Sequence, residues 1–294
     1  MIFLPLLVAV LATQATGCIR IRENGEDKLR LAGMEWGSAV LKGNGKIITR
    51  TIAAPEFEYL SANRGIEVEL QEGIDQITVH ADENVMPYVV ITCPNGSLGI
   101  TIDSQIKQVS EATIRVVCPL RPTLRSVQAF SGAEIGHAAA NFVVEHEFRI
   151  EASSAGEVAF SLTAPRLKVE ASSGGEVKGE WVADQLALNA SSAAEIKASL
   201  SRGSLRVDSS SGSDVELRGV ADSAEMSASS GASIEADRLQ CRRVEASAAS
   251  GGDIELFCSE YLRASASSGG SVEYSGPCQT EISRSSGGSV TQNN

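Results

Sequence analysis

The chain has 294 residues, of which 43% are apolar, so it can bury a sizeable core and wholesale disorder is excluded. Its formal net charge of −12 argues against a nucleic-acid partner, because phosphate backbones require a basic surface. Aromatic residues make up only 4%, so the core is expected to be aliphatic and narrow. These values predict an acidic, folded protein without nucleic acid among its partners.

An uncharged apolar segment, IFLPLLVAVLATQATGC, occupies residues 2–18 and ends in small residues. It is too short for a stable membrane span and is typical of a signal peptide. The small residues before Cys18 resemble the cleavage box of bacterial lipoproteins, which predicts a lipoprotein-type signal peptide over 1–17 and lipidation of Cys18. The alternative is ordinary signal cleavage that leaves Cys18 free. Both predict export, and the first predicts an outer-membrane lipoprotein of the cell envelope, facing the periplasm or the outside.

Residues 18–45 are polar and irregular, which predicts a tether that holds the folded part away from a membrane. Residues 46–135 then alternate as short strands separated by turns, which predicts a β-rich N-terminal region. Its last strand ends in SGAEI at 131–135 and already resembles the repeats that follow. We therefore expect this region to continue without a linker into repeats that fill 136–294.

One phrase is written eight times between Phe148 and Val290, for example LKVEASSGGEV at 167–177. Its closing Val or Ile recurs in steps of 19, 19, 19, 19, 20, 18 and 18 residues. Each copy opens with the alternation of a strand that has one buried face, and Ser-Ser-Gly-Gly then permits a sharp turn into a second strand. A period this short, with strand signals in both halves, predicts an all-β solenoid, a right-handed parallel β-helix with rungs of about 19 residues.

Stacking the copies predicts three inward-facing columns of residues. The first contains Phe148, Leu167, Leu186, Leu205 and Leu262; the second Ile150, Val169, Leu188, Val207, Met226 and Val244; the third Ala152, Ala171, Ala190, Ala228, Ala246 and Ala266. In the last copy polar Thr280 and Arg284 replace Leu and Ala, as expected of a terminal rung that faces water.

The segment GNGKIITR, then FEYLSANRGIEVELQEG and QITVHADENVMPYVVITCPNGSLGITI, followed by the SSGGEV-type repeats, resembles the bacterial family of putative auto-transporter adhesins with a head GIN domain. The resemblance covers residues 43–290. It implies an exported β-helical protein, commonly with a lipoprotein-type leader, and no established catalytic residues. The last rung is followed directly by Asn294, so we expect no run of membrane-spanning strands after it and no translocator.

An acidic residue precedes most of the closing Val or Ile residues and predicts a stacked column of carboxylates. Its members are Glu134, Glu157, Glu176, Glu195, Asp214 and Asp253, interrupted by Ser233. Such a column presents a negative stripe to a ligand, foremost through Glu157, Glu176, Glu195 and Asp214, or coordinates calcium. The alternative is a solvated polar edge whose repulsion is relieved by nearby Lys and Arg residues. We expect no bound metal and no cofactor, since the calcium-binding nonapeptide pattern is missing.

Five cysteines follow Cys18: Cys93, Cys118, Cys241, Cys258 and Cys278. The last three are 17 and 20 residues apart, so neighbours are expected on adjacent rungs, either as disulfides or as buried thiols. The repeated serines lack a base for nucleophilic catalysis, because His80, His137 and His146 all precede the regular repeats. His146 shares the alternation of Val144 and Phe148, which predicts a core histidine.

These observations predict a non-enzymatic binding or structural module of the cell envelope, adhesin-like and held to a membrane by its lipid anchor. Its partner would be an envelope or extracellular protein or glycan, bound with avidity through a repetitive face. The alternative is a polysaccharide-binding or polysaccharide-degrading β-helix protein. Degrading enzymes need long excursions that wall a cleft, and rungs of 18 to 20 residues leave no room for them. The open ends of the solenoid also predict end-to-end self-association.

Overall fold

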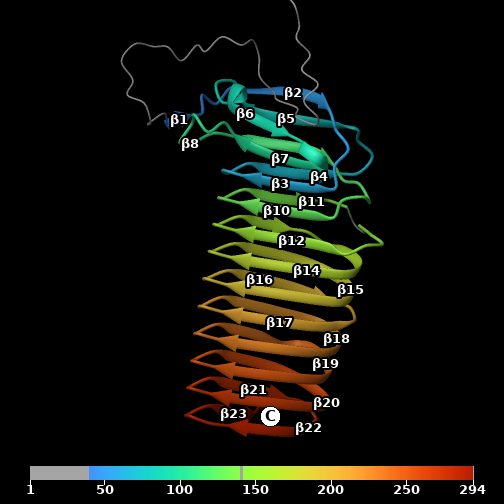
Figure 1. The fold of residues 1–294 in the computed structure, drawn as a ribbon, viewed down its shortest axis with the longest axis vertical. Helices are drawn as coiled ribbons and strands as arrows, with labels where there is room; N and C mark the ends of the chain where they lie inside the picture. Colours follow the sequence, from blue (N-terminus) through green and yellow to red (C-terminus); the bar gives the residue numbers. More distant parts are fainter. Residues whose placement is uncertain (1–39, 140–141, 294) are drawn as a thin grey trace, which may run out of the picture.

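Residues 40–139 and 142–293 are described by the structure, a computed structural model. They form a parallel β-helix of about nine turns, as the repeat predicts, with additional strands at its N-terminal end (Figure 1). Within these two described ranges, no helix is long and apolar enough to cross a membrane. The predicted signal peptide, Cys18 and most of the predicted tether lie outside the described residues.

The N-terminal region holds two short 3-10 helices, η1 (Met86–Tyr88) and η2 (Pro94–Gly96). Its strands are β1 (Val40–Lys42), β2 (Ile47–Ala53), β3 (Tyr59–Asn63), β4 (Glu67–Gln71), β5 (Gln76–Asp82), β6 (Val89–Thr92), β7 (Ser97–Ile102), β8 (Gln108–Ser110) and β9 (Ile114–Pro119). β1 lies in the last part of the predicted tether and pairs in parallel with β8.

The repeats form the strands from β10 onward, and several strands bend continuously from one rung into the next. They are β10 (Ser126–Phe130), β11 (Glu134–His137), β12 (Phe148–Ser153), β13 (Glu157–Ala159), β14 (Leu162–Ser172), β15 (Glu176–Ser191), β16 (Glu195–Leu200), β17 (Ser204–Ser210), β18 (Asp214–Ser229), β19 (Ser233–Ala249), β20 (Asp253–Ser267), β21 (Ser271–Ser275), β22 (Gln279–Arg284) and β23 (Ser289–Gln292).

The order of strands along the axis departs from the order in the sequence at the N-terminal end. β3 and β4 form a rung with an Arg64-Gly65 turn, and this rung pairs in parallel with β10 and β11 on one side. On its other side it pairs with β7 and β9, which come later in the chain. β2, β5 and β6 complete this end with antiparallel pairings. The rung at 59–71 is thus enclosed between segments that follow it in sequence.

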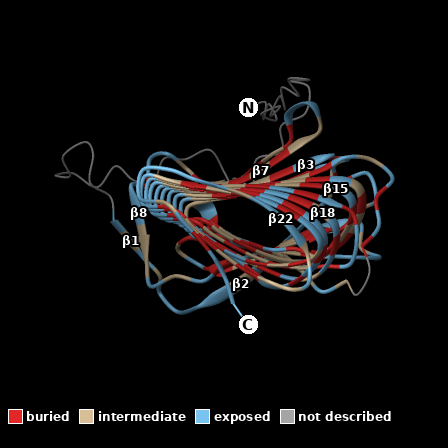
Figure 2. Ribbon diagram, turned by 90° about the horizontal axis from the view of Figure 1, so that it is seen from below, coloured by how far each residue is buried: buried red, intermediate tan, exposed pale blue. Residues whose placement is uncertain are grey.

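The core is a narrow apolar interior between two sheets, and the sharp turns stack along one edge (Figure 2). Phe148, Ile150 and Ala152 are fully buried, while Arg149 and Glu151, which alternate with them on the strand, face outward. Rungs stack in register, for example Leu167 beside Leu186 and Leu186 beside Leu205. The largest buried side chain is Trp181, whose Nε1 donates a hydrogen bond to the Phe160 carbonyl at 2.7 Å.

The structure corrects the predicted columns at the rung of 20 residues. Val244 pairs with Ala224 and Leu262, so it belongs to the first column, not the second. Ala246 correspondingly belongs to the second column, and Ala248 takes its place in the third. The extra residue is absorbed as an irregularity between Glu235 and Arg238, so the register counted back from the Ser-Gly turn is preserved.

The last rung is polar, as predicted. Thr280 stacks on Leu262 and Arg284 stacks on Ala266, so polar side chains that water can solvate take the places of the apolar residues in these columns. Strand β22, which carries both residues, lies mostly exposed at the C-terminal end of the described chain.

Candidate ligand-binding surfaces

The predicted acidic column exists as a register of stacked carboxylates. Glu134, Glu157, Glu176, Glu195 and Asp214 are successive partners on adjacent strands, and the column also includes Glu67 on β4. Parallel pairing places neighbours ~4.8 Å apart at the backbone, so the carboxylates would repel one another if nothing neutralised them.

Lysines two residues further along the strand relieve much of this repulsion. The Lys178 ammonium lies 3.5 Å from Glu157 and 2.5 Å from Glu176, and the Lys197 ammonium lies 2.5 Å from Glu195. These hydrogen bonds raise the pKa of both lysines, so both stay charged. Among the described residues no group of three or more His, Cys, Asp or Glu side chains is placed to hold a metal ion. This part of the column has the arrangement of a solvated, ion-paired edge, and a ligand role for its carboxylates stays a prediction.

A second acidic column, which sequence reasoning missed, continues the column of Lys178 and Lys197. The next partners in register are Glu216, Glu235, Glu255 and Glu273. The pKa of Glu255 is raised by its burial and by the charges of Glu273, Asp253, Asp237 and Glu235. The signal was a Glu directly after the closing Val or Ile of four successive copies, in the motifs DVEL, SIEA, DIEL and SVEY.

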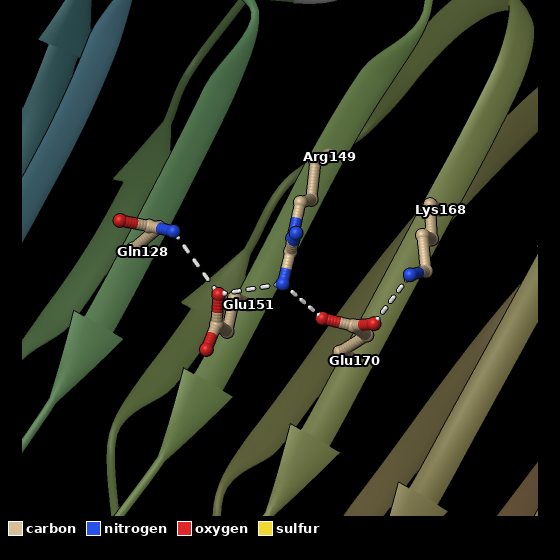
Figure 3. Close-up of polar contacts among 5 residues, drawn as sticks. All are labelled: Gln128, Arg149, Glu151, Lys168 and Glu170. Atoms are coloured by element: carbon tan, nitrogen blue, oxygen red, sulfur yellow. Dashed lines mark hydrogen bonds and ion pairs between the residues drawn. The ribbon is translucent and has the colours of Figure 1, made fainter.

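We call the face built from β10, β12, β14 and the strand segments stacked on them the first sheet. Its outward side carries a ladder of charged groups across β10, β12 and β14 (Figure 3). Arg149 binds both Glu151 and Glu170, the Gln128 amide donates to Glu151 at 3.0 Å, and the Lys168 ammonium lies 2.7 Å from Glu170. Burial of Glu170 acts to raise the pKa of its carboxyl, but the hydrogen bond from Lys168 and the charge of Arg149 outweigh burial and lower it. The ladder joins three rungs through their side chains.

Beside this ladder a groove of about 680 Å³ runs along the axis from the level of Glu147 to that of Arg263. We call it the axial groove. Two outward columns line it, two residues apart on each strand. The first contains Arg166, Gln185, Ser204, Ser223, Arg243 and Tyr261; the second contains Lys168, Ala187, Arg206, Glu225, Glu245 and Arg263. Between the columns, residues such as Leu186 and Leu205 have buried side chains, so the floor is low.

The charges in the axial groove are paired unevenly. Arg206 lies 3.0 Å from Asp208 and 2.9 Å from Glu225, whose hydrogen bonds and charges raise its pKa, and Arg263 lies 3.6 Å from Glu245 and from Glu281. The Arg243 guanidinium has neither an ion pair nor a hydrogen bond within the described part of the chain. Next to it in register, Tyr261 is 40% exposed, and its hydroxyl donates to Glu281 at 2.7 Å.

The five described cysteines are thiols, not disulfides, which corresponds to one of the two alternatives drawn from the sequence. Cys241 and Cys258 are partners in register, as their spacing predicts. Burial raises the pKa of Cys241 to about 11 and that of Cys278 to about 11, and it also raises the pKa of Cys118. Cys118, Cys241 and Cys278 are therefore protonated and unreactive at neutral pH.

The histidines have structural contacts, but one of them is placed differently from the prediction. His146 is partly exposed rather than in the core, and its two ring nitrogens lie 3.1 Å from the carbonyl oxygens of Glu147 and Pro122. His137 is partly buried and packs edge-on against Phe160, with its Nδ1 accepting from the Ala139 amide. Burial lowers the pKa of His137, so its ring is neutral at neutral pH.

Solved structures with the same fold include three proteins from Parabacteroides species. A putative adhesin from Parabacteroides merdae ATCC 43184 has 19% identity and a TM-score of 0.60, over 86% of this chain and 99% of that one. One from Parabacteroides distasonis ATCC 8503 has 18% identity and a TM-score of 0.58, over 87% and 100%. A putative lipid binding protein from the same strain has 19% identity and a TM-score of 0.55, also over 87% and 100%. At these identities the likeness establishes the fold alone.

No curated protein is similar enough in sequence to be a detectable relative. The sequence does match one family description twice, over residues 56–180 and 176–277, so the match spans the N-terminal rungs and most of the repeats. This is the family that the GNGKIITR and SSGGEV-type segments indicate. The chain belongs to the family described as putative auto-transporter adhesin, head GIN domain.

Proposed function

We propose that this protein is a non-enzymatic binding module of the cell envelope, adhesin-like, and held to a membrane by a lipid on Cys18. The observation that carries the binding role is the unbroken outer surface of the rod. Strands β15, β18, β19 and β20 each run through a bend without interruption over 15 to 17 residues. No loop rises from these bends to wall a catalytic cleft, and the faces repeat with every rung.

A repeating rigid face favours a repeating ligand. Each rung presents its outward side chains at the same fixed spacing of ~4.8 Å, so a polymer or an array can engage several rungs at once. Affinity then accumulates from weak, equivalent contacts instead of from one deep pocket. The family description supports this adhesin-like role, and the lipid anchor at Cys18 is supported by the leader sequence.

The anchoring and the exposure are tested by comparing the wild type with Cys18→Ala in intact cells. We expect the wild type in the membrane fraction and digestible by an external protease, and the variant in the soluble fraction or the medium. A control Cys278→Ala, which changes a thiol far along the chain, should leave fractionation unchanged.

Two outcomes would overturn parts of the proposal. Equal fractionation of the wild type and Cys18→Ala would remove the lipid anchor. Protection of the wild type until the outer membrane is opened would remove adhesion to other cells and place the binding role inside the envelope.

A further inference from the structure

We infer that the axial groove binds a linear acidic polysaccharide that carries about one carboxylate per disaccharide. The inference rests on the proposed binding function and names the ligand class. It depends on the shape of the groove, on the spacing of its cations and on one unpaired arginine.

The shape of the groove fits an extended polymer. Its lining residues come from Glu147 to Arg263, which spans seven successive strands of the first sheet, and the volume of about 680 Å³ is spread along this length. Six steps of ~4.8 Å give a length of roughly 29 Å. A compact small molecule would contact only a fraction of such a site, whereas a chain of sugars would follow it from end to end.

The charge of the groove is opposite to that of the molecule. Five cations, Arg166, Lys168, Arg206, Arg243 and Arg263, face three carboxylates, Glu147, Glu225 and Glu245, on a chain whose net charge is −12. An anionic ligand is therefore attracted into the groove and repelled from the rest of the surface. A densely charged nucleic acid or an anionic bilayer would meet the acidic columns as well, so both are disfavoured.

The first four cations of the groove recur at intervals of two rungs, and the fifth, Arg263, lies one rung beyond Arg243. Arg166 and Lys168 share one strand, Arg206 lies two rungs further, and Arg243 lies two rungs beyond Arg206. The rungs between them present Gln185 with Ala187, or Ser223 with Glu225. Two rungs correspond to ~10 Å, which is close to the length of one extended disaccharide. A polymer with alternating acidic and neutral sugars would place each carboxylate at a cation and each neutral sugar over a polar or small rung.

Arg243 and Tyr261 form the best-equipped subsite. The guanidinium of Arg243 has all its side-chain donors free of partners in the described chain, and arginine binds carboxylates through two parallel hydrogen bonds. The exposed ring of Tyr261 on the next rung offers a face for a sugar. Rearranging the other pairs costs little, because Arg206 and Glu225 are more than half exposed and such ion pairs contribute little stability.

The test measures binding of fluorescent hyaluronan oligosaccharides, which alternate acidic and neutral sugars, to the purified protein by anisotropy at low and high salt. We expect binding that weakens with salt, and a neutral dextran oligosaccharide should not bind. Arg243→Ala should weaken binding about tenfold, the loss of one charge-assisted contact. Ala187→Trp, an outward substitution in the second column that fills part of the groove without changing its charge, should weaken binding at least as much.

Arg218→Ala is the matched control, because Arg218 is an exposed arginine on the other sheet and lies outside the groove. Its binding should equal that of the wild type, and circular dichroism should show all variants folded. The inference is overturned if the wild type does not bind, if dextran binds equally well, or if Arg218→Ala loses as much affinity as Arg243→Ala.

A preference for heparin or polygalacturonate over hyaluronan would overturn the disaccharide spacing. Because this assay uses purified protein, its result is independent of Cys18: binding without surface exposure would leave the groove intact and remove only the adhesive role.

Discussion

Two residues with positive φ make each sharp turn of the solenoid, and they explain why the repeat is written in Ser, Gly and Ala. Ser173 and Gly174 have φ of 52° and 70°, and Ser192 and Ala193 have 55° and 59°. Positive φ at both central positions is the geometry of a type I′ turn, which glycine adopts readily and alanine only with strain.

The residue after the turn is restricted for a different reason. A Cβ added to Gly175 would lie 2.4 Å from the carbonyl oxygen of Ala152 on the preceding rung. Ala194 and Ala232 hold the same place in other rungs, where they are buried. Small side chains are therefore required here because the backbone of the preceding rung passes close by. In the Gly-Gly signature the first glycine meets the positive φ of the turn, and the second meets this close packing.

Ala193→Gly should stabilise the protein by roughly 0.5–1 kcal/mol, because it relieves the left-handed conformation of an alanine. The gain is partly offset, since glycine loses more conformational entropy than alanine on folding. Urea denaturation followed by circular dichroism measures the change. The control Ala190→Gly changes a buried strand residue and should destabilise. Destabilisation by both substitutions would show that the turn is not strained.

At the scale of the element, what varies along the solenoid is the charge of its outward columns. In the ladder of β10, β12 and β14, a column of cations lies beside a column of acids, and each acid has a cation within reach. Near the C-terminal end, Glu235, Glu255 and Glu273 are consecutive partners with like charge. A carboxylate on this surface is thus stabilised or destabilised by the charges beside it, both on its own strand and on the neighbouring rungs.

Glu170→Gln and Glu255→Gln should change stability in opposite directions at neutral pH. The lowered pKa of Glu170 means that its ionised form stabilises the fold, and this contribution is lost as pH falls through the folded-state pKa. The raised pKa of Glu255 means that its ionised form destabilises the fold, and this penalty is relieved as pH falls through that raised pKa.

Urea midpoints of both variants against wild type, at neutral and at acidic pH, measure these effects. We expect Glu170→Gln to lower the midpoint and Glu255→Gln to raise it at neutral pH. Both differences should shrink at a pH below the ordinary carboxyl range. The same sign for both variants would contradict the assignment.

The whole molecule behaves as a stack in which each rung contacts only its neighbours, so its length is set by the number of rungs. The N-terminal end is closed by the antiparallel strands β2, β5 and β6, whereas β22 and β23 each pair on one side only within the described chain. Self-association through these last strands stays a prediction. Their polar side chains counteract it, because charged and polar edges disfavour pairing.

Deleting residues 186–204 removes one full period and joins Gln185 to Leu205, which restores the register on both sides. We expect a folded protein with lower stability, because one rung interface is lost, and a long axis shorter by ~4.8 Å. Small-angle scattering and circular dichroism measure both. Deleting 186–195 instead removes about half a period and should prevent folding of the repeats, because it removes the Ser192-Ala193 turn and joins the first half of one rung to the second half, so the rungs on the two sides can no longer stack. Equal folding of both deletions would contradict the stacked-rung description.

The sequence by itself determined the rung, because its information is local. The period, the alternation and the Ser-Gly turn specify one coil, and identical coils can only stack. The wrong column predicted for Val244 shows the limit of this reasoning. A rung with one added residue can accommodate it as a bulge or as a longer strand, and the amino-acid sequence is compatible with both.

The tertiary structure alone decided the rest. That β3 and β4 lie between β9 and β10 depends on long-range pairing, which no local pattern encodes. The axial groove likewise depends on stacking, because its lining residues come from successive rungs. Arg166, Arg206 and Arg243 line one groove only because the rungs stack in register. Composition predicted an acidic surface, and stacking gathered five of its cations in one groove, because the register of the strands, not the order of the chain, decides which charges meet.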